Sequence, residues 1–257
     1  MRNTIQKLFQ WKIADKLAFL TKFERNFSLI KCNFVEDNEH EIPKRGTQKK
    51  FRRSDKDALR TYIAHRLQQG IETAKEEFER RQILFSHHEQ EDLEKRIIFD
   101  IAKVESIWID DLYLLGKPTL VGGHENTLAL DDTTGFLYKS NNLFNAKFLV
   151  SNLLKQINLH NELFPETYCE LVGFTGFDNG KCHAPYIEVI YKQQYVDNAI
   201  QATPIEIRDF MLAIGFKQID ETRYTNDVII VADLYPRNVL KDMHGYIYVV
   251  DDIVTLV

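Results

Sequence analysis

The pattern of apolar residues changes near residue 106, and this change limits the fold more than any other feature of the sequence. Before it, apolar residues recur at helical spacing, and Ser86 with Glu89 three residues later has the form of a capping box. After it, short β-rich runs alternate with Gly, Pro and Asp. The sequence therefore predicts an α+β protein, with an all-helical N-terminal region at 1–106 and a sheet-containing domain at 107–257.

Composition excludes several classes of protein. With 257 residues, 44% of them hydrophobic, the chain can bury a core in one large domain or two ordinary ones. A net charge of -5 gives no general attraction to nucleic acid or membrane. No run approaches the ~18 apolar residues of a membrane span. Three cysteines without metal-ligand spacing suit a reducing compartment. We therefore expect a cytoplasmic protein with no membrane partner.

Individual elements are predicted from periodicity and from turn residues. In the N-terminal region, helices are expected at 4–30, 55–85 and 87–104. In the second region, strands are expected at 119–121, 127–130, 136–139, 168–174 and 186–191, with a helix at 143–157 between the third and fourth of them. A further helix is expected near 205–216. The order is therefore strand, glycine-containing loop, strand, strand, helix, strand, strand.

A hairpin near the end of the sequence brings polar residues together. Short apolar runs flank the turn-forming segment 242–245. If the turn is centred between His244 and Gly245, Asn238 lies opposite Asp251, and Asp233 is on the loop just before. An amide oxygen and a carboxylate held this close suit Mg²⁺, which prefers oxygen ligands. The alternative is that both residues only end strands and cap turns.

The same residues have the spacing of a protein-kinase site. Asp233 and Asn238 reproduce the D-x-x-x-x-N pattern of a kinase catalytic loop, and Asp251 follows thirteen residues later. Upstream, Gly122 and Gly123 lie between two predicted strands, as in a loop that covers phosphates. Lys139 lies on the third predicted strand, and an amphipathic helix follows it. The order of these elements is more specific than any one of them.

Residues 122–257 resemble a narrower family, the polyvalent protein kinase domain of large phage and conjugative-element proteins. The resembling pieces are GGHENTLAL, LYKSNNL, INLHNELFPETYCELVGF, KQQYV and ADLYPRNVLKDMHGYIYVVDDI. The resemblance implies a minimal protein-kinase-like lobe, with an antiparallel sheet plus a helix and a shortened C-terminal lobe. It also implies a Mg²⁺-assisted transfer of the ATP γ-phosphoryl group to a hydroxyl acceptor. It implies no particular substrate, so the partner beyond the nucleotide is an unidentified protein or small molecule.

The resemblance also implies a role for each site residue. Asp233 accepts or orients the proton of the acceptor hydroxyl, and Lys139 pairs with the phosphates. Asn238 and Asp251 hold the metal. The adenine is expected near the end of the fifth predicted strand, at 191–194. The nucleotide-binding residues are therefore Gly122, Gly123, His124, Glu125, Lys139, Tyr191 and Gln193.

Several positions depart from the kinase pattern. The D-F-G triplet is Asp251-Asp252-Ile253, and six residues follow Asp251, so an activation segment and peptide-docking helices are not expected. Asn158 stands where a helix glutamate normally pairs with the lysine, which leaves Glu162 and Glu125 as alternatives. These departures keep a catalytically inactive pseudokinase, acting as an interaction module, as an alternative. A second alternative is a nucleic-acid-associated accessory protein of a mobile element that acts through the basic segment 44–53, although a solvated linker is the simpler interpretation of that segment.

Overall fold

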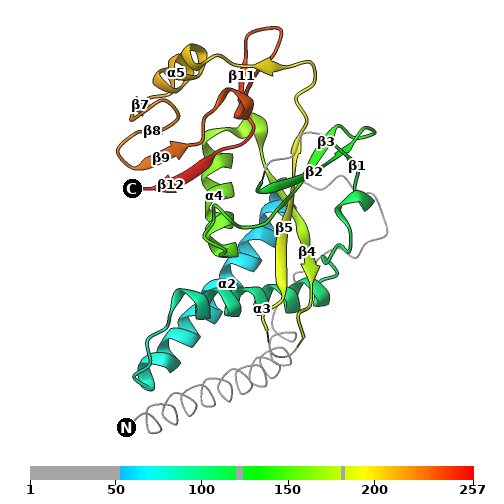
Figure 1. The fold of residues 1–257 in the computed structure, drawn as a ribbon, viewed down its shortest axis with the longest axis vertical. Coiled ribbons are helices and arrows are strands. Elements are labelled where there is room, and N and C mark those ends of the chain that lie inside the picture. The colour runs from blue at the N-terminus through cyan, green and yellow to red at the C-terminus, as the bar shows by residue number, and fades with distance from the viewer. Residues whose placement is uncertain (1–52, 120–123, 181–182) are drawn as a thin grey trace, which may run out of the picture. The chain divides into compact units, whose positions relative to one another are not determined.

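The computed structural model describes residues 53–119, 124–180 and 183–257 (Figure 1). All of them belong to one compact unit, Phe51–Val257. They contain four α-helices and three antiparallel sheets, which confirms the α+β class. The helix predicted at 4–30 and nearly all of the basic segment 44–53 lie outside the described residues, so the all-helical character of the N-terminal region stays a prediction. None of the described helices combines the length and the apolar character that a membrane span requires.

Two helices precede the sheet, α2 (Arg53–Arg80) and α3 (His87–Val104), and they pack against each other. The capping box predicted for α3 is confirmed, because Ser86 Oγ accepts from Glu89 N at 3.3 Å and the Glu89 carboxylate accepts from Ser86 N at 2.9 Å. An apolar stripe on α3 is buried, with Leu93, Ile97, Ile98, Ile101 and Ala102 as members. Burial of this stripe, rather than helix propensity alone, holds the pair of helices together.

The main sheet has five antiparallel strands in the order β1-β2-β3-β5-β4. The strands are β1 (Lys117–Pro118), β2 (Asn126–Asp131), β3 (Phe136–Asn141), β4 (Glu170–Phe177) and β5 (Tyr186–Gln194). Between β3 and β4 the chain forms α4 (Val150–Leu163), which lies beside the sheet in Figure 1. Lys139 is therefore on a central strand, with Leu128 and Tyr191 as its two neighbours across the ladders.

The helix before β4 begins later than the periodicity indicates. The apolar spacing predicts a helix from residue 143, but α4 begins at Val150, and residues 143–149 form an irregular connection with positive φ at Leu143, Lys147 and Phe148. Leu143 and Ala146 are buried in this connection without being helical. These two buried loop residues are three positions apart, which is also the spacing of an apolar helix face, and the helix was therefore predicted to begin too early.

The chain passes from α3 to the edge of the sheet through a close backbone contact. Ile109 N donates to Phe174 O at 2.8 Å, and Phe174 N donates to Ile107 O at 3.0 Å. Gly173 permits this approach, because a Cβ there would lie 2.2 Å from Ile107 O. Together with the contacts of α3 to β4 and β5, this backbone contact packs α3 against the sheet.

The remaining residues form a C-terminal part built from very short strands. Its elements are β6 (Ile200–Gln201), α5 (Pro204–Ala213), β7 (Lys217–Gln218), β8 (Tyr224–Thr225), β9 (Ile229–Ala232), β10 (Val239–Lys241), β11 (Ile247–Val249) and β12 (Ile253–Leu256). They form two small sheets, β11-β10-β6 and β12-β9-β8-β7. Their core includes Met211, Tyr224 and Val254, and β12 packs against α4.

The predicted register of the β10–β11 hairpin is wrong by one residue. Val239 pairs with Val249 and Lys241 with Ile247, so the turn is centred on His244. The cause is Asp242, whose Oδ1 accepts from the backbone N–H of His244 and of Tyr246, both at 2.9 Å. This arrangement closes a three-residue loop in which Gly245 takes φ +88°. Asn238 is therefore opposite Val250, and its carbonyl accepts from Val250 N at 2.9 Å and Asp251 N at 3.3 Å.

Candidate functional site

A cavity lies where the sheet, α4 and the last loop of the chain meet. It is lined by Glu125, Lys139 and Tyr191 from the sheet region, by α4 and by residues 250–253. Its volume is about 40 Å³. On the same scale a water molecule needs about 10–15 Å³. The cavity therefore has room for water molecules or a cation, but not for a whole nucleotide.

Lys139 is the buried cation of this cavity. Its side chain lies on β3, and Nζ donates to the carbonyl oxygen of Val250 at 2.6 Å. This contact joins residues that are 111 positions apart and places the ammonium beside the residue before Asp251. Among the residues that the structure describes, no carboxylate forms an ion pair with Lys139. A backbone carbonyl thus holds the lysine where a glutamate was expected.

Glu125 is the acid that shares the cavity with Lys139. Its carboxylate accepts from Asn141 Nδ2 at 3.1 Å and from Asn145 Nδ2. Burial raises the pKa of Glu125, the hydrogen bond from Asn141 lowers it, and the charge of Asp251 raises it. Glu162, the other alternative for the lysine partner, is not among the lining residues.

Asp233, Asn238 and Asp251 are neighbours. Asn238 Nδ2 donates both to the carbonyl oxygen of Asp233 at 2.8 Å and to its carboxylate at 2.7 Å. Asp233 takes φ +65°, a left-handed conformation that is uncommon outside glycine and is held here by these bonds. Burial raises the pKa of Asp233, the Arg237 guanidinium opposes that shift, and the charge of Asp251 adds to it. The three groups therefore form one electrostatic cluster.

The other predicted nucleotide-binding residues differ in whether they are described, buried or part of the cavity wall. Gly122 and Gly123 lie outside the described residues. His124 is exposed, and its carbonyl accepts from Asn142 Nδ2 at 2.9 Å. Tyr191 is buried on the cavity wall, and its hydroxyl donates to Asn126 Oδ1 at 3.3 Å. Gln193 is buried too, but its side chain donates to the carbonyl of Thr167 at 2.9 Å and does not line the cavity.

The sequence reasoning missed a buried ion pair beside the cavity. His160 Nδ1 lies 2.6 Å from Asp252 Oδ1, and both side chains are less than a tenth exposed. Burial disfavours the imidazolium, but the charge and hydrogen bond of Asp252 outweigh it and raise the pKa of His160 well above its usual range. A signal existed in the sequence, because His160 continues the apolar stripe of α4 three residues after Ile157.

A second missed residue is Glu94 of α3. It is fully buried, and its carboxylate accepts from Ser151 N at 3.0 Å and from Ser151 Oγ at 2.7 Å. The first turn of α4 has no side-chain cap of its own, since Leu149 occupies the cap position. Glu94 therefore caps α4 from another helix, with its negative charge at the positive end of the helix dipole. Its place on the apolar stripe of α3, three residues before Ile97, could have identified it.

The sequence matches the family model of the serine/threonine/tyrosine kinase found in polyvalent proteins over residues 90–257, which is more than half of the chain. The chain belongs to this family. The polyvalent-protein kinase match confirms the resemblance and extends it toward the N-terminus to include most of α3, with Glu94. No curated protein and no solved structure matched the chain significantly. The kinase family is therefore the finding from which a function can be argued.

Proposed function

We propose that the chain is an ATP-dependent phosphotransferase that moves the γ-phosphoryl group to a hydroxyl acceptor with the help of Mg²⁺. The observation that supports this most directly is the contact between Lys139 Nζ and Val250 O. It brings a strand lysine to the residue before Asp251, next to the pair formed by Asp233 and Asn238. These are the residue types that protein kinases use to handle nucleotide phosphates and metal.

Lys139 is suited to pair with phosphate oxygens. An ammonium has three N–H donors, and the Val250 carbonyl takes one of them. The remaining donors face a cavity that also contains the carboxylates of Glu125 and Asp251. A bound phosphate would add negative charge there, so a second cation is needed to balance the site.

The donors around the cavity fit a hard cation. No group of three or more His, Cys, Asp or Glu side chains within the described ranges is arranged to hold a metal by itself. Mg²⁺ does not require such a group, because it keeps several waters and uses one or two carboxylates plus substrate phosphates. Asp251 would supply the carboxylate, and Asn238 the amide oxygen that its hydrogen bonds to Asp233 leave free. When bound, the ion would offset charge on the β- and γ-phosphates.

Asp233 is suited to orient the acceptor. The amide of Asn238 fixes its carboxylate, and the left-handed backbone of Asp233 limits its direction. Burial raises the pKa of Asp233, which makes its carboxylate a better proton acceptor than a free aspartate. In this proposal Asp233 accepts or positions the proton of the hydroxyl group that receives the phosphoryl group.

A pseudokinase is the second candidate, and one observation favours it. Lys139 binds a backbone carbonyl, and within the described residues it has no acidic partner from α4 of the kind that active kinases use. Such a protein would bind nucleotide without turning it over. A nucleic-acid function of the segment 44–53 stays a prediction, since that segment lies almost entirely outside the described residues.

Thermal unfolding with ATP, with and without Mg²⁺, followed by an ATP turnover assay, separates these candidates. We expect ATP to raise the melting temperature more in the presence of Mg²⁺, and Asp251→Ala to abolish that difference. Lys139→Ala should weaken ATP binding by about 10- to 100-fold, the value of a charged hydrogen bond. Lys192→Ala is the matched control, because this lysine follows Tyr191 on β5 and pairs with Glu170 outside the cavity.

The outcomes are distinct. Binding with turnover supports the phosphotransferase, and Mg²⁺-dependent binding without turnover supports the pseudokinase. Unchanged ATP affinity in Lys139→Ala would show that the lysine assignment is wrong. No stabilisation by ATP under any condition would rule out both candidates.

A further inference from the structure

Two adjacent aspartates follow β11, and they have different surroundings. Asp251 lines the cavity with Lys139 and Glu125. Asp252 reaches α4, where its Oδ1 lies 2.6 Å from His160 Nδ1. The two carboxylates are chemically equivalent, so their surroundings determine which of them can bind a cation.

The partners of His160 establish its charge. Nδ1 faces the carboxylate of Asp252, and Nε2 lies 3.0 Å from the carbonyl oxygen of Thr167. The hydroxyl of Thr167, which also approaches Nε2, donates to the carbonyl of Phe164 at 3.2 Å. Both ring nitrogens therefore lie within hydrogen-bond distance of acceptors, an arrangement that suits an imidazolium whose charge balances that of Asp252.

The second carboxylate oxygen of Asp252 makes this residue depend on its ion pair with His160. Asp252 Oδ2 is buried and has no hydrogen-bond partner, so His160 provides the charge compensation for this carboxylate. A buried charge that loses its partner is strongly disfavoured and seeks another cation. The cation that the cavity wall offers to it is Lys139, and a turn of Asp252 toward Lys139 would move the segment that also carries Asp251.

The helix that carries His160 is held firmly at its other end. Glu94 of α3 accepts two hydrogen bonds from Ser151 in the first turn of α4, and α4 also packs along β12. In most protein kinases the corresponding helix reaches the site through a glutamate that pairs with the lysine. Here α4 presents Leu153, Gln156, Ile157 and His160 to the cavity, and no carboxylate.

We propose that His160 is a positioning residue that binds Asp252 to α4 and so leaves Asp251 as the carboxylate that receives the cation. This inference rests on the proposed function, and it assigns to His160 and Asp252 the link between helix and metal site that a lysine–glutamate pair usually makes. The link runs from Glu94 through α4 and His160 to the segment 250–253. His160 itself touches neither nucleotide nor metal.

The test measures Mn²⁺ binding to the full chain in the presence of a non-hydrolysable ATP analogue, by electron paramagnetic resonance. His160→Gln leaves Asp252 charged without a counter-ion, and we expect Mn²⁺ affinity to fall about 10- to 100-fold, as for other residues that orient metal ligands. The double variant His160→Gln/Asp252→Asn replaces the ion pair by two neutral amides. It should restore Mn²⁺ affinity to within about threefold of the original chain.

A stability control and a second readout separate positioning from a general structural role. Met211→Ala removes a fully buried side chain from the C-terminal core, so it lowers the melting temperature but should leave Mn²⁺ affinity unchanged. Amide hydrogen exchange of residues 250–253 should increase in His160→Gln and return toward the original rate in the double variant.

Each result decides the question. If His160→Gln affects Mn²⁺ affinity no more than Met211→Ala does, or if the double variant binds as weakly as the single one, His160 does not position the site. If His160→Gln fails to fold, the double variant tests the proposal instead, because it contains no uncompensated charge. Loss of Mn²⁺ binding in the double variant would then overturn the proposal. If the original chain binds no Mn²⁺ with the analogue, the proposed function is wrong and this inference is wrong with it.

Discussion

The sheet region, residues 107–194, and the C-terminal region, residues 195–257, contribute to the same site by different means. The four longer strands of the sheet region, β2 to β5, have six to nine residues, whereas β6 to β12 have two to four. The sheet region also buries many polar side chains, among them Asn126, Lys139, Ser140 and Asn141. The C-terminal region, all of which is described, buries fewer polar side chains, among them Asn238 and the carboxylate of Asp252.

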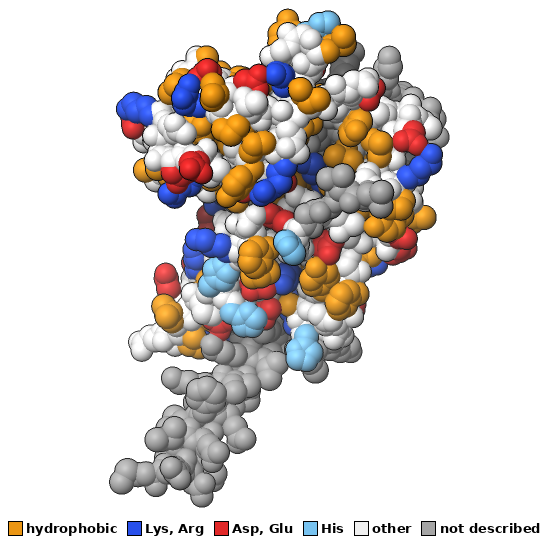
Figure 2. Space-filling model, turned by 45° about the horizontal axis from the view of Figure 1, so that its top comes forward, with side chains coloured by type: hydrophobic (Ala, Val, Ile, Leu, Met, Phe, Trp, Pro, Cys, Tyr) orange, Lys and Arg blue, Asp and Glu red, His pale blue; other side chains and the backbone are white. Residues whose placement is uncertain are grey.

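This difference indicates that the two regions have different roles, ligand binding in the sheet region and catalysis in the C-terminal region. The sheet region has the longer strands and a hydrogen-bonded polar network around Lys139, which suits the binding of a charged ligand. The C-terminal region is a small core that presents Asp233 and Asn238, and its surface carries many exposed hydrophobic side chains, including Ile205, Met243 and Tyr246 (Figure 2). We therefore expect changes in the sheet region to affect binding, and changes around Asp233 to affect turnover.

The largest expected effect is loss of the fold when α2 and α3 are removed. A fragment of residues 107–257 lacks Glu94, which caps α4, and exposes the apolar face on which α3 packs. It should show no cooperative thermal transition by circular dichroism. A fragment of residues 51–257 is the control and should melt cooperatively, since these residues form one compact unit. Cooperative melting of the shorter fragment would show that the sheet region is self-sufficient.

Asp233→Asn should lower turnover about 10²- to 10⁴-fold while nucleotide affinity stays the same, because it removes a proton acceptor and keeps the shape of the side chain. Asparagine also tolerates the left-handed backbone that Asp233 adopts. Asp227→Asn is the matched control, since Asp227 is an exposed aspartate with φ +72° in the same region. Steady-state kinetics and calorimetric ATP titration give the two quantities. Equal losses in both variants would refute the role of Asp233.

Gly173→Ala should lower the free energy of unfolding by about 1–3 kcal/mol, the usual cost of overpacking. The added Cβ would lie 2.2 Å from the carbonyl oxygen of Ile107, so the link between α3 and β4 must shift. Thr175→Ala, two residues further along β4, is the control. Urea unfolding measures both. A neutral Gly173→Ala would mean that the contact between helix and sheet adapts easily.

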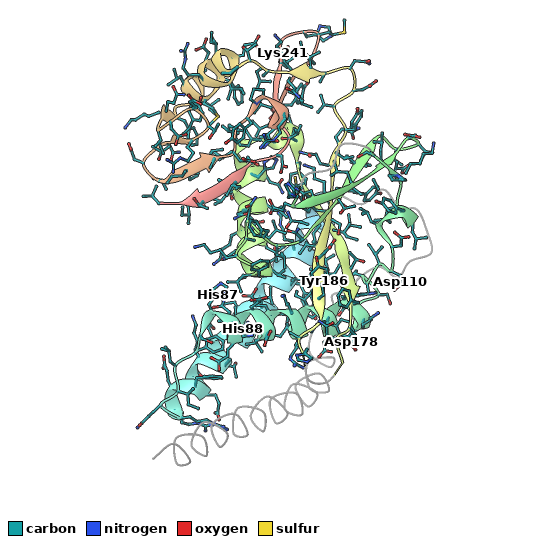
Figure 3. All side chains as sticks on the ribbon, in the orientation of Figure 1. His87, His88, Asp110, Asp178, Tyr186 and Lys241 are labelled. Carbon is teal, nitrogen blue, oxygen red and sulfur yellow. The ribbon has the colours of Figure 1, made fainter. Side chains whose placement is uncertain are left out.

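The smallest expected effect is a pH dependence within the C-terminal region. Lys241 on β10 donates to Glu206 on α5 at 2.5 Å, and Figure 3 shows Lys241 beside that helix. Hydrogen bonds from Lys241 and Thr203 lower the pKa of Glu206 from 4.5 to about 2. Because the folded pKa lies below the unfolded one, the contribution is complete above pH 4.5 and is lost as the pH falls toward about 2.

Lys241→Gln should reduce this acid dependence, measured as the change in the urea midpoint between pH 6 and pH 3. Lys155→Gln, which changes an exposed lysine on α4, is the control and should keep the original dependence. The pair joins two surface elements, so we expect a modest change. If Lys241→Gln and the original chain lose stability equally over this range, the ion pair does not contribute.

Local signals in the sequence predicted much of the fold. The capping box at Ser86, the strand that carries Lys139 and the two strands that flank the turn at 242–245 could be predicted from residue patterns, because each depends on neighbours in the chain. The hairpin register could not. The predicted and the observed hairpin differ by one residue in their pairing, and the hydrogen bonds of the Asp242 side chain select the observed one.

The site was less predictable than the fold for a related reason. The spacing of Asp233 and Asn238 in the sequence places them on one loop, but nothing local shows that Lys139 binds a carbonyl 111 residues away. Glu94 and His160 each interrupt an apolar stripe, which marks them as unusual without naming their partners. Tertiary contacts between distant segments decide such pairings, and periodicity does not contain them.

Because α4 is held at both ends, its length fixes the distance and the angle between its two contacts. His160, bound by Asp252, is nine positions further along the helix than Ser151, bound by Glu94. At 1.5 Å and about 100° per residue, the two contacts lie roughly 13 Å apart along the axis and on opposite sides of the helix. Inserting or deleting one residue between them would turn His160 by about 100° away from Asp252 while Glu94 still held the other end. Relatives that keep both contacts should therefore tolerate substitutions along the exposed side of α4, but they should share its length between these two points.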